Sequence, residues 1–374
     1  MTMSEAVARP LVPANIAGLA PYEPGKPIEE VERELGITGV VKLASNENPL
    51  GPSALAVAAA AAVVGKVSLY PDGGSHYLKA GLAGRLGLGV TPRELVVGSG
   101  SSEIIEGLVR TFCTPADEVL TFAYSFVMYP IVCQAQGVPM VEAPLGERFS
   151  YDVDALLERV TPRTKLVFLA NPNNPTGSYL GRVGLERLVR ELPPGIILAL
   201  DEAYREYVTA PDFVDGLALR GLRDRLVVMR TFSKIYGLAG LRCGYGVMTP
   251  ELAGFLDRMR MPFNVTTVAQ AGALAALGDE EHVARSREVN RAGMIQLGEG
   301  LGKLGLDVLP SQGNFVLVDL GAGREANVVF QKMLRKGVIV RSMAAYKLPT
   351  HIRITVGAQA DNARLLGALA ECLG

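Results

Sequence analysis

Short apolar segments alternate with helical segments along most of this chain of 374 residues. Six segments have the length and the apolar or β-branched composition of buried strands: 94–98, 118–122, 165–170, 196–200, 226–230 and 244–248. Helical patterns separate most of them, for example over residues 102–112 and 179–191. This alternation favours an α/β fold, in which helices cover both faces of a mostly parallel sheet.

The pattern changes near residue 280. A long, charged, amphipathic helix is expected over residues 279–305. After it we expect a strand at 313–318, a helix at 326–336, and strands at 338–341 and 352–356. This succession predicts a second, smaller α+β unit in the C-terminal part of the chain.

Composition excludes several classes of protein. The 37 Lys and Arg residues nearly cancel the 38 Asp and Glu residues, so we expect no overall field that would hold a nucleic acid or an anionic membrane. The chain has three histidines and four cysteines, with no C-x-x-C pair. We therefore expect neither a protein-held metal nor a disulfide framework.

No targeting or spanning segment is expected. Glu5, Arg9 and two prolines interrupt the first 18 residues, where an export signal needs an unbroken apolar region. The longest apolar run covers 54–64, and a membrane span takes about 20 residues. Pro52 and Ser53 precede this alanine-rich run, which reads as a soluble packed helix. We expect a cytoplasmic protein with reduced thiols.

A stiff loop, Asn171-Pro-Asn-Asn-Pro-Thr-Gly177, follows one predicted strand directly. The two X-Pro steps restrict Asn171 and Asn174 to extended backbone. The loop would hold an amide at the carboxyl end of a parallel strand, where ligands bind in open α/β sheets. The alternative is a turn without further role.

An acidic residue ends the next predicted strand, in Ile196-Ile-Leu-Ala-Leu-Asp201-Glu-Ala-Tyr204. A buried carboxylate is costly unless it meets a cation or hydrogen-bond donors. Asp201 is therefore a candidate catalytic group with Tyr204 three residues later, although Asp is also a favoured helix cap.

Lys234 follows a further strand, and Arg242 comes eight residues later, after a glycine-rich turn. A lysine among small and apolar residues can lose its charge by desolvation and act as a nucleophile. The alternative is a solvated loop lysine.

In Gly98-Ser99-Gly100-Ser101-Ser102, glycines and hydroxyls at a helix start predict an anion site. The turn lacks the dinucleotide fingerprint and the P-loop spacing, so we expect a phosphate that is not a nucleotide's.

These four motifs, in this order, resemble those of the fold-type I pyridoxal-phosphate (PLP) aminotransferases. The resemblance implies a large PLP-binding domain at 51–280 and a small domain built from both chain ends. Residues 1–50 would supply an N-terminal arm and part of the small domain, and residues 281–374 the rest.

The resemblance also implies a role for each motif. Lys234 would bind the cofactor covalently and then carry the substrate proton, Asp201 would keep the pyridine nitrogen protonated, and Tyr204 completes the catalytic set. The implied contacts are Tyr204 and Asn174 on the ring oxygen, and Ser99, Gly100, Ser101, Ser233 and Arg242 on the phosphate. Phe126 would stack on the ring, with Tyr124 as the reserve candidate and core packing as the alternative for Phe126.

The chain ends narrow the resemblance to the histidinol-phosphate aminotransferase family. It rests on 22–36, Leu43-Ala-Ser-Asn-Glu-Asn-Pro49, Tyr70-Pro-Asp-Gly73, 262–265, 313–316, 337–341 and 353–357, so it covers residue 22 to the end. It implies that Arg353 and Arg341 bind the substrate's acidic groups, with Tyr22, Asn46 and Asn174 in the same subsite. Tyr70 would reach the cofactor phosphate of a partner subunit, which requires a homodimer with a shared active site.

The expected reaction is transamination of histidinol phosphate with 2-oxoglutarate, without metal, nucleic acid or membrane. Ser99 and Ser102 depart from the Asn and Asp that the family more often has. Backbone N–H groups do most of the binding there, so the cofactor assignment stands.

Three rivals remain: an aromatic amino-acid aminotransferase that uses Arg353 for a carboxylate, a PLP-dependent decarboxylase of phosphothreonine, and a transcription regulator with an aminotransferase-like domain. The regulator would need a basic DNA-binding module that this chain does not show.

Overall fold

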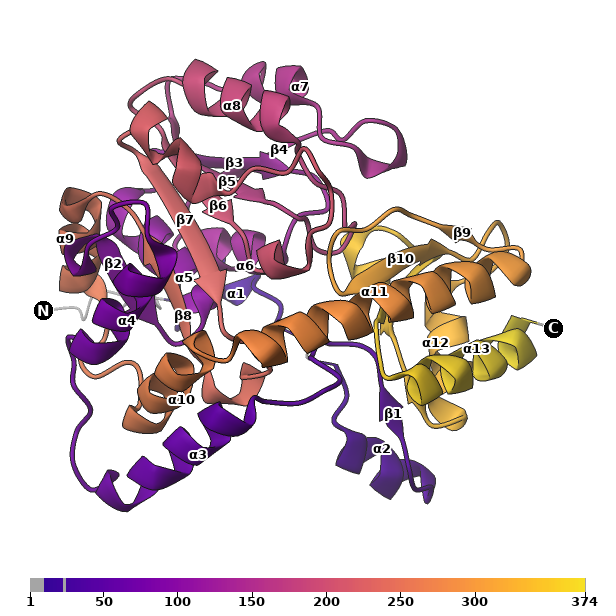
Figure 1. Ribbon diagram of the computed structural model, residues 1–374. Helices are drawn as coiled ribbons and strands as arrows, with labels where there is room; N and C mark the ends of the chain where they lie inside the picture. Colours follow the sequence, from indigo (N-terminus) through magenta and orange to yellow (C-terminus); the bar gives the residue numbers. More distant parts are fainter. Residues whose placement is uncertain (1–9, 23–24, 374) are drawn as a thin grey trace, which may run out of the picture.

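The structure is a computed structural model that describes residues 10–22 and 25–373. Glu5 and Arg9, on which the expectation of no export signal rests, lie outside these residues, as do Glu23 and Pro24 of the predicted N-terminal arm. The described chain forms a larger lobe around one sheet and a smaller lobe that contains the last helix, α13 (Gln359–Leu373) (Figure 1).

In the described part of the chain, seven strands form the large sheet. Their order is β2 (Leu95–Gly98), β8 (Gly244–Val247), β7 (Leu226–Thr231), β6 (Ile197–Asp201), β5 (Thr164–Ala170), β3 (Glu118–Phe122) and β4 (Met140–Ala143). β8 runs antiparallel to both of its neighbours, and the other neighbouring pairs are parallel. The predicted mostly parallel sheet is confirmed: the six predicted strands have their boundaries within one residue of those observed, and β4 is an additional strand.

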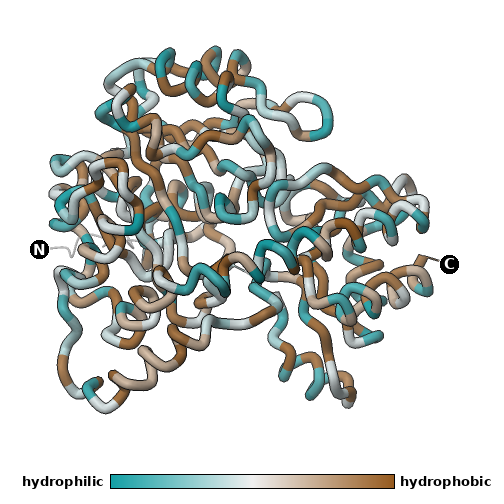
Figure 2. Tube along the Cα trace, in the orientation of Figure 1, coloured by the Kyte–Doolittle hydropathy of each residue, from teal (hydrophilic) through white to brown (hydrophobic). Residues whose placement is uncertain are grey.

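Each central strand is buried on both faces, because successive side chains point to opposite sides of the sheet. In β6, Leu198 and Leu200 belong to one apolar cluster, while Ile197 and Ala199 belong to the other. Figure 2 shows these strands as continuously hydrophobic segments inside the large lobe. This is why the sequence shows unbroken apolar runs there instead of alternation.

Helices complete both clusters. The cluster with Leu198 includes side chains of α4 (His76–Leu86), α7 (Val153–Leu157), α8 (Arg182–Glu191) and α10 (Thr267–Leu277). The cluster with Ile197 includes side chains of α5 (Ser101–Phe112), α6 (Met128–Ala135) and α9 (Pro250–Met259). Helices therefore cover the two faces of the sheet.

One predicted helix starts later than expected. The pattern placed its beginning at residue 179, but α8 begins at Arg182. The Leu180 N–H donates to the Asn171 side-chain oxygen at 2.8 Å, and the Leu180 carbonyl accepts from the Asn171 amide at 3.1 Å. These bonds hold residue 180 to the loop after β5, so they keep that segment out of the helix and stiffen the loop.

The smaller lobe contains segments from both chain ends. Its antiparallel sheet has the order β12 (Arg341–Ser342), β13 (His351–Thr355), β10 (Phe315–Asp319) and β9 (Asp307–Val308). β1 (Val41–Lys42) pairs in parallel with β11 (Val338–Ile339). The helices of this lobe include α2 (Ile28–Leu35), α12 (Ala326–Arg335) and α13 (Gln359–Leu373).

The prediction of one strand over 338–341 is wrong. Val338 and Ile339 pair with β1, whereas Arg341 and Ser342 pair with β13. The chain changes its partner at the buried Val340, so one apolar run serves two separate sheets. A run of this kind looks continuous in sequence because burial, and not pairing, determines its composition.

One long helix connects the two lobes: α11 (Glu280–Lys303), which begins beside α10 and ends in the smaller lobe (Figure 1). The Asp279 side chain accepts from the His282 N–H at 3.0 Å and from the Ser53 hydroxyl at 2.5 Å. Ser53 in turn caps α3 (Ala54–Val63). These two caps therefore join the starts of helices that are more than 200 residues apart in sequence.

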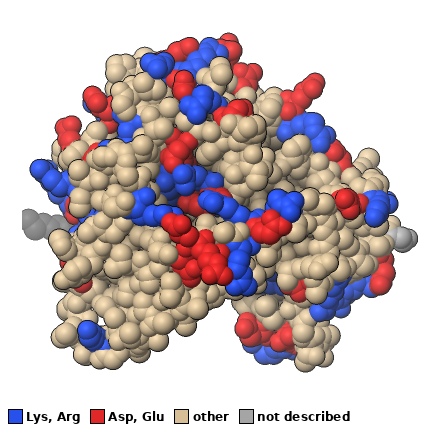
Figure 3. All heavy atoms as spheres, in the orientation of Figure 1, with Lys and Arg blue, Asp and Glu red and all other residues tan. Residues whose placement is uncertain are grey.

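Within residues 10–22 and 25–373, no helix combines the length and the apolar composition that crossing a membrane requires. Lys, Arg, Asp and Glu side chains gather where the two lobes meet on the face shown in Figure 3. Between the two lobes the structure forms a cavity.

Candidate active site

A cavity of about 300 Å³ lies between the two lobes, at the carboxyl ends of β5, β6 and β7. It is lined by most of the side chains that the sequence motifs singled out: Tyr22, Asn46, Ser101, Phe126, Asn174, Asp201, Tyr204, Ser233, Lys234, Arg242, Arg341 and Arg353. The strand-end motifs of the large lobe and the arginines of the small lobe thus meet in one place.

Three of the predicted residues do not line this cavity. The Ser99 N–H donates to the Glu103 carboxylate at 2.5 Å, so a residue of the chain already uses this group. Gly100 lies so close to the Arg242 guanidinium that a Cβ atom on it would be 2.6 Å from a guanidinium nitrogen. Tyr70 is 82% exposed and stacks on Phe263 with ring centroids 4.6 Å apart. Tyr70 therefore lies outside this cavity.

Asp201 ends β6 and is buried. One of its oxygens accepts from the Tyr129 hydroxyl at 3.1 Å, and the other accepts from the Ala203 N–H at 3.2 Å. Burial nevertheless raises the pKa of the Asp201 carboxyl to about 6, against the lowering effect of both donors and of Lys234. A cationic N–H placed in the cavity would stabilise this carboxylate.

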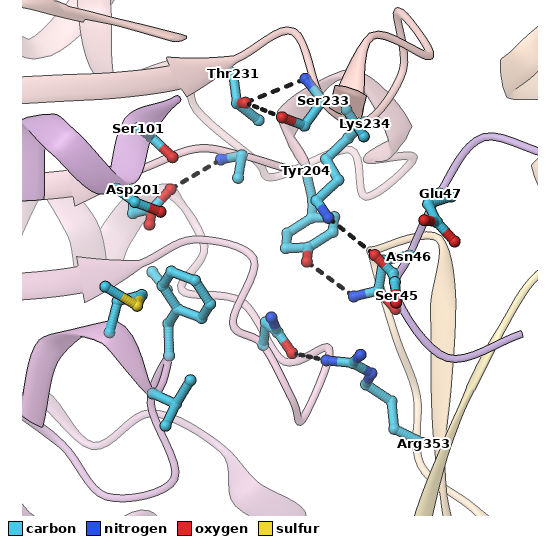
Figure 4. A pocket seen from close by; sticks show the side chains of 18 of the residues that line it. Ser45, Asn46, Glu47, Ser101, Asp201, Tyr204, Thr231, Ser233, Lys234 and Arg353 are labelled. Carbon is cyan, nitrogen blue, oxygen red and sulfur yellow. Dashed lines mark hydrogen bonds between the residues drawn. The ribbon is translucent and has the colours of Figure 1, made fainter. Parts of the chain in front are cut away.

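Lys234 lies on the loop after β7, and its amine donates to the Ser45 carbonyl at 3.2 Å (Figure 4). Burial and, to a smaller extent, the charge of the neighbouring Arg353 lower the pKa of Lys234 to about 8. The amine lies 5.6 Å from the centroid of the Tyr204 ring. A lysine with this pKa is partly neutral near neutral pH, as a nucleophile and proton carrier requires.

The Tyr204 hydroxyl accepts from the Asn46 side-chain amide at 2.8 Å (Figure 4). Asn46 itself is fixed by Thr355, whose hydroxyl bonds both its backbone N–H, at 2.9 Å, and its side-chain oxygen, at 3.0 Å. Burial raises the pKa of Tyr204 to about 12, so its phenol keeps its proton at neutral pH. Tyr204 can therefore donate a hydrogen bond to an oxygen in the cavity.

Arg242 and the start of α5 form a compact corner that suits a phosphate. A Cβ atom on Gly100 would lie 2.6 Å from the Arg242 guanidinium, and one on Gly244 would lie 2.5 Å from the Ser101 nitrogen. Glycine at both positions lets the guanidinium and the helix start approach each other. The Ser233 hydroxyl accepts from Thr231 at 3.0 Å nearby. Backbone N–H groups, hydroxyls and a guanidinium are the donors that phosphate oxygens prefer.

Arg341 and Arg353 face each other across β12 and β13, where they are direct partners in the antiparallel register. Arg353 is buried, donates to Asn174, and donates to the Ala44 carbonyl at 2.6 Å. Burial lowers its pKa, but an arginine retains its charge at any ordinary pH. Among the described residues, no hydrogen bond is made by its buried Nε atom. The pair offers two positive charges to an acidic ligand.

Phe126 lines the cavity, whereas Tyr124 packs edge-on against Phe149 with centroids 5.4 Å apart. This placement favours Phe126 over Tyr124 as the stacking residue, which stays a prediction. Sequence reasoning missed Tyr346 and Glu47, which also line the cavity. An aromatic residue between the strands of Arg341 and Arg353 was the available signal for Tyr346.

These residues fit PLP. A partly neutral buried lysine, a buried carboxylate that forms no ion pair within the described residues, and a glycine-lined corner beside an arginine match the aldehyde, the pyridine nitrogen and the phosphate of that molecule. Among the described residues, no group of three or more His, Cys, Asp or Glu side chains could hold a metal ion.

The family model described as "Aminotransferase class I and II" matches residues 38–369, and the chain belongs to this family. Within it, the chain is 53% identical over 365 residues to a histidinol-phosphate aminotransferase from Anaeromyxobacter sp. (strain Fw109-5), which covers 98% of this chain and 100% of the relative. It is 45% identical over 359 residues to the histidinol-phosphate aminotransferase of Moorella thermoacetica, covering 96% of this chain and 92% of the relative.

Solved structures agree. The histidinol-phosphate aminotransferase from Sinorhizobium meliloti, in complex with pyridoxal-5'-phosphate, superimposes with a TM-score of 0.87 over 98% of each chain at 28% identity. Thermus thermophilus aspartate aminotransferase with maleate has a TM-score of 0.85 at 24% identity over 98% of this chain and 100% of that chain, which supports the fold. The expected fold-type I aminotransferase architecture is confirmed.

Proposed function

We propose that this chain is a PLP-dependent transaminase that transfers the amino group of L-histidinol phosphate to 2-oxoglutarate, giving imidazole-acetol phosphate and glutamate in histidine biosynthesis (EC 2.6.1.9). The observation that carries the proposal is one cavity in which Lys234 and Asp201 lie opposite the paired Arg341 and Arg353. The two relatives named histidinol-phosphate aminotransferase, at 45–53% identity over nearly the whole chain, support this proposal.

The cofactor supplies an electron-withdrawing ring that stabilises negative charge on the substrate carbon. The neutral amine of Lys234 takes up and returns the proton of that carbon, which its lowered pKa permits. The Asp201 carboxylate would stabilise a positive charge at the ring nitrogen, and Tyr204 would donate to the ring oxygen. Arg242, Ser233, Ser101 and the backbone around Gly100 would hold the cofactor phosphate.

The two arginines account for the substrates. Histidinol phosphate brings a phosphate dianion and 2-oxoglutarate brings two carboxylates, so both substrates need two positive charges or a bidentate donor. Arg353 forms the fixed anchor because Asn174 and Ala44 hold it in place. Arg341 supplies the second charge, and Tyr22 closes the entrance.

We further propose a homodimer with shared active sites. α3 and the loop after it expose six large apolar side chains, Leu55, Val57, Val64, Val67, Leu69 and Tyr70, each more than half exposed. An apolar surface of this kind is typical of an interface. A second copy that covers it brings Tyr70 to the partner's cofactor phosphate.

The division into residues 1–50, 51–280 and 281–374 and a cytoplasmic location belong to the same proposal. The parallel pairing of β1 with β11 supports the contribution of the first segment to the small domain. All four cysteines are free thiols, which suits a reducing compartment.

The deciding experiment compares kcat/KM for histidinol phosphate and for phenylalanine, each with 2-oxoglutarate. We expect histidinol phosphate to be preferred, because a buried guanidinium pair gains more from a dianion than from one carboxylate. A preference for phenylalanine of tenfold or more would reject the proposed substrate and support an aromatic amino-acid aminotransferase.

A further inference from the structure

Tyr129 is a buried tyrosine of α6 that does not line the cavity, yet it contacts two residues that do. Its hydroxyl donates to Asp201 at 3.1 Å, and its ring meets Phe126 edge to face, with centroids 5.9 Å apart and an interplanar angle of 88°. On its other side, the ring stacks on Phe168 of β5 at 4.5 Å and 6°.

Resting on the proposed function, we infer that Tyr129 is a positioning residue of the reaction. Its hydroxyl fixes the Asp201 carboxylate, and its ring edge supports Phe126. One side chain outside the cavity thereby sets the position of a group at the edge of the cofactor ring and of a group over its face.

The hydroxyl group itself points to this role. Tyr129 is fully buried within an apolar cluster that contains Phe168, Ile105 and Leu166, where a phenylalanine would pack equally well. A buried hydroxyl costs free energy unless it makes a hydrogen bond. The bond that it makes goes to Asp201. The presence of the hydroxyl is therefore explained by its hydrogen bond to the Asp201 carboxylate and not by packing in the core.

Asp201 depends on this bond. Among the described residues, its Oδ2 atom accepts from Tyr129, and its Oδ1 atom accepts from the Ala203 N–H. Without the phenol, half of a fully buried carboxylate would lose its donor. The carboxylate would be free to rotate away from the cavity, and its protonated form would be favoured.

The charged and titratable groups around Asp201 act in known directions. Lys234, on the loop after β7, and the Tyr129 hydroxyl, from α6, both lower the pKa of Asp201, while burial raises it. Tyr204 directly follows Ala203, and Tyr151 precedes α7. Both tyrosines stay protonated because burial raises their pKa values. Burial likewise raises the pKa of Tyr129 well above 10, so its phenol remains a donor.

Tyr129→Phe removes the hydroxyl and keeps the ring. We expect kcat of the PLP-loaded enzyme to fall about 10- to 100-fold with KM nearly unchanged, as the loss of a hydrogen bond to a charged group implies. We expect the Kd for PLP of the apoprotein to rise in the same variant. The acidic limb of the kcat profile should move to higher pH, because Asp201 is then protonated more easily.

Tyr151→Phe is the matched control. The Tyr151 hydroxyl also belongs to a tyrosine near Asp201, but it donates to the Ala170 carbonyl at 2.5 Å. Its removal should leave the acidic limb and the Kd for PLP within about twofold of the wild type. The melting temperatures of both variants report any general loss of packing.

A double-mutant cycle tests whether Tyr129 acts through Asp201. In an Asp201→Asn background, Tyr129→Phe should change the Kd for PLP by less than twofold. The inference is overturned if Tyr129→Phe and Tyr151→Phe shift PLP affinity and the acidic limb alike, or if the full effect persists in Asp201→Asn. A wild type that binds no PLP would instead reject the proposed function itself.

Discussion

The two sides of the cavity are assembled in different ways. Most of the proposed cofactor side comes from one stretch of the large lobe: Asp201 ends β6, and Tyr204, Ser233, Lys234 and Arg242 follow β6 or β7. The substrate side comes from both chain ends, and its bond between Arg353 and the Ala44 carbonyl joins residues 309 positions apart. The cofactor side is therefore set by local strand ends, whereas the substrate side exists only when the smaller lobe is folded.

This difference separates chemistry from selectivity. Changes on the cofactor side should affect every substrate equally, because all substrates share the reacting carbon. Changes on the substrate side should depend on which acidic groups of a substrate the changed arginine binds. Five experiments test this separation.

The largest effect is expected from Lys234→Ala on the cofactor side. Because no other buried amine lines the described cavity, we expect activity to fall by about 10⁴-fold or more with every amino donor. Borohydride treatment should add the mass of PLP to the wild type and to the control Lys303→Ala, but not to Lys234→Ala. A wild type that acquires no mass and no visible absorption would reject the assignment.

Asp201→Ala should leave PLP bound but lower proton transfer about 10³-fold, because the ring nitrogen loses its anionic partner. The measurement is the exchange of the donor's Cα hydrogen with solvent deuterium, with the exposed Asp224→Ala as the control. Exchange at the wild-type rate would show that Asp201 has no part in stabilising the charge.

Arg353→Gln on the substrate side should lower kcat/KM about 10²- to 10³-fold for both histidinol phosphate and phenylalanine, since it removes a buried, hydrogen-bonded charge. PLP content should stay at the wild-type level. A loss of PLP together with activity would mean that the two sides are not separable.

Arg341→Gln should raise KM for histidinol phosphate about tenfold and change KM for phenylalanine by less than twofold, because a dianion uses both guanidiniums. The exposed Arg335→Gln of α12 controls for the loss of one positive charge. Equal effects on the two substrates would mean that Arg341 stabilises β12 and does not distinguish between substrates.

The smallest effect concerns pH. Because the pKa of Lys234 is lowered to about 8, the fraction of this amine that is neutral decreases as the pH falls below 8. The rate at which the apoprotein captures PLP should drop about fivefold from pH 8 to pH 7 and level off above pH 8. A rate that keeps rising tenfold per pH unit up to pH 10 would indicate an ordinary lysine.

All of the predicted substrate-side residues line the cavity, whereas Ser99, Gly100 and Tyr70 of the predicted cofactor side do not. Asp201 and Lys234 were visible because a polar residue that ends a buried strand breaks an apolar pattern. The β4 strand, with its half-buried side chains, and the short β1 lacked that contrast. The split between β11 and β12 depends on a change of partner, which leaves no trace in composition.

The missed site residues have a similar explanation. Tyr129 was not singled out, because its proposed role depends on a contact with Asp201 across 72 positions. Ser99 was predicted to bind phosphate, yet its N–H is taken by Glu103, four residues later in the first turn of α5. Competition among local donors and acceptors decides such cases, and residue types alone do not reveal it.

The direct pairing of Arg341 with Arg353 gives this protein a way to change its selectivity without changing either arginine. Side chains alternate between the faces of a strand, so a shift of one residue turns a side chain to the opposite face. Insertion or deletion of one residue in the connection over 343–350 is therefore a route by which evolution or design could withdraw one charge from the site. Loop length, and not side-chain identity, would then encode the preferred substrate.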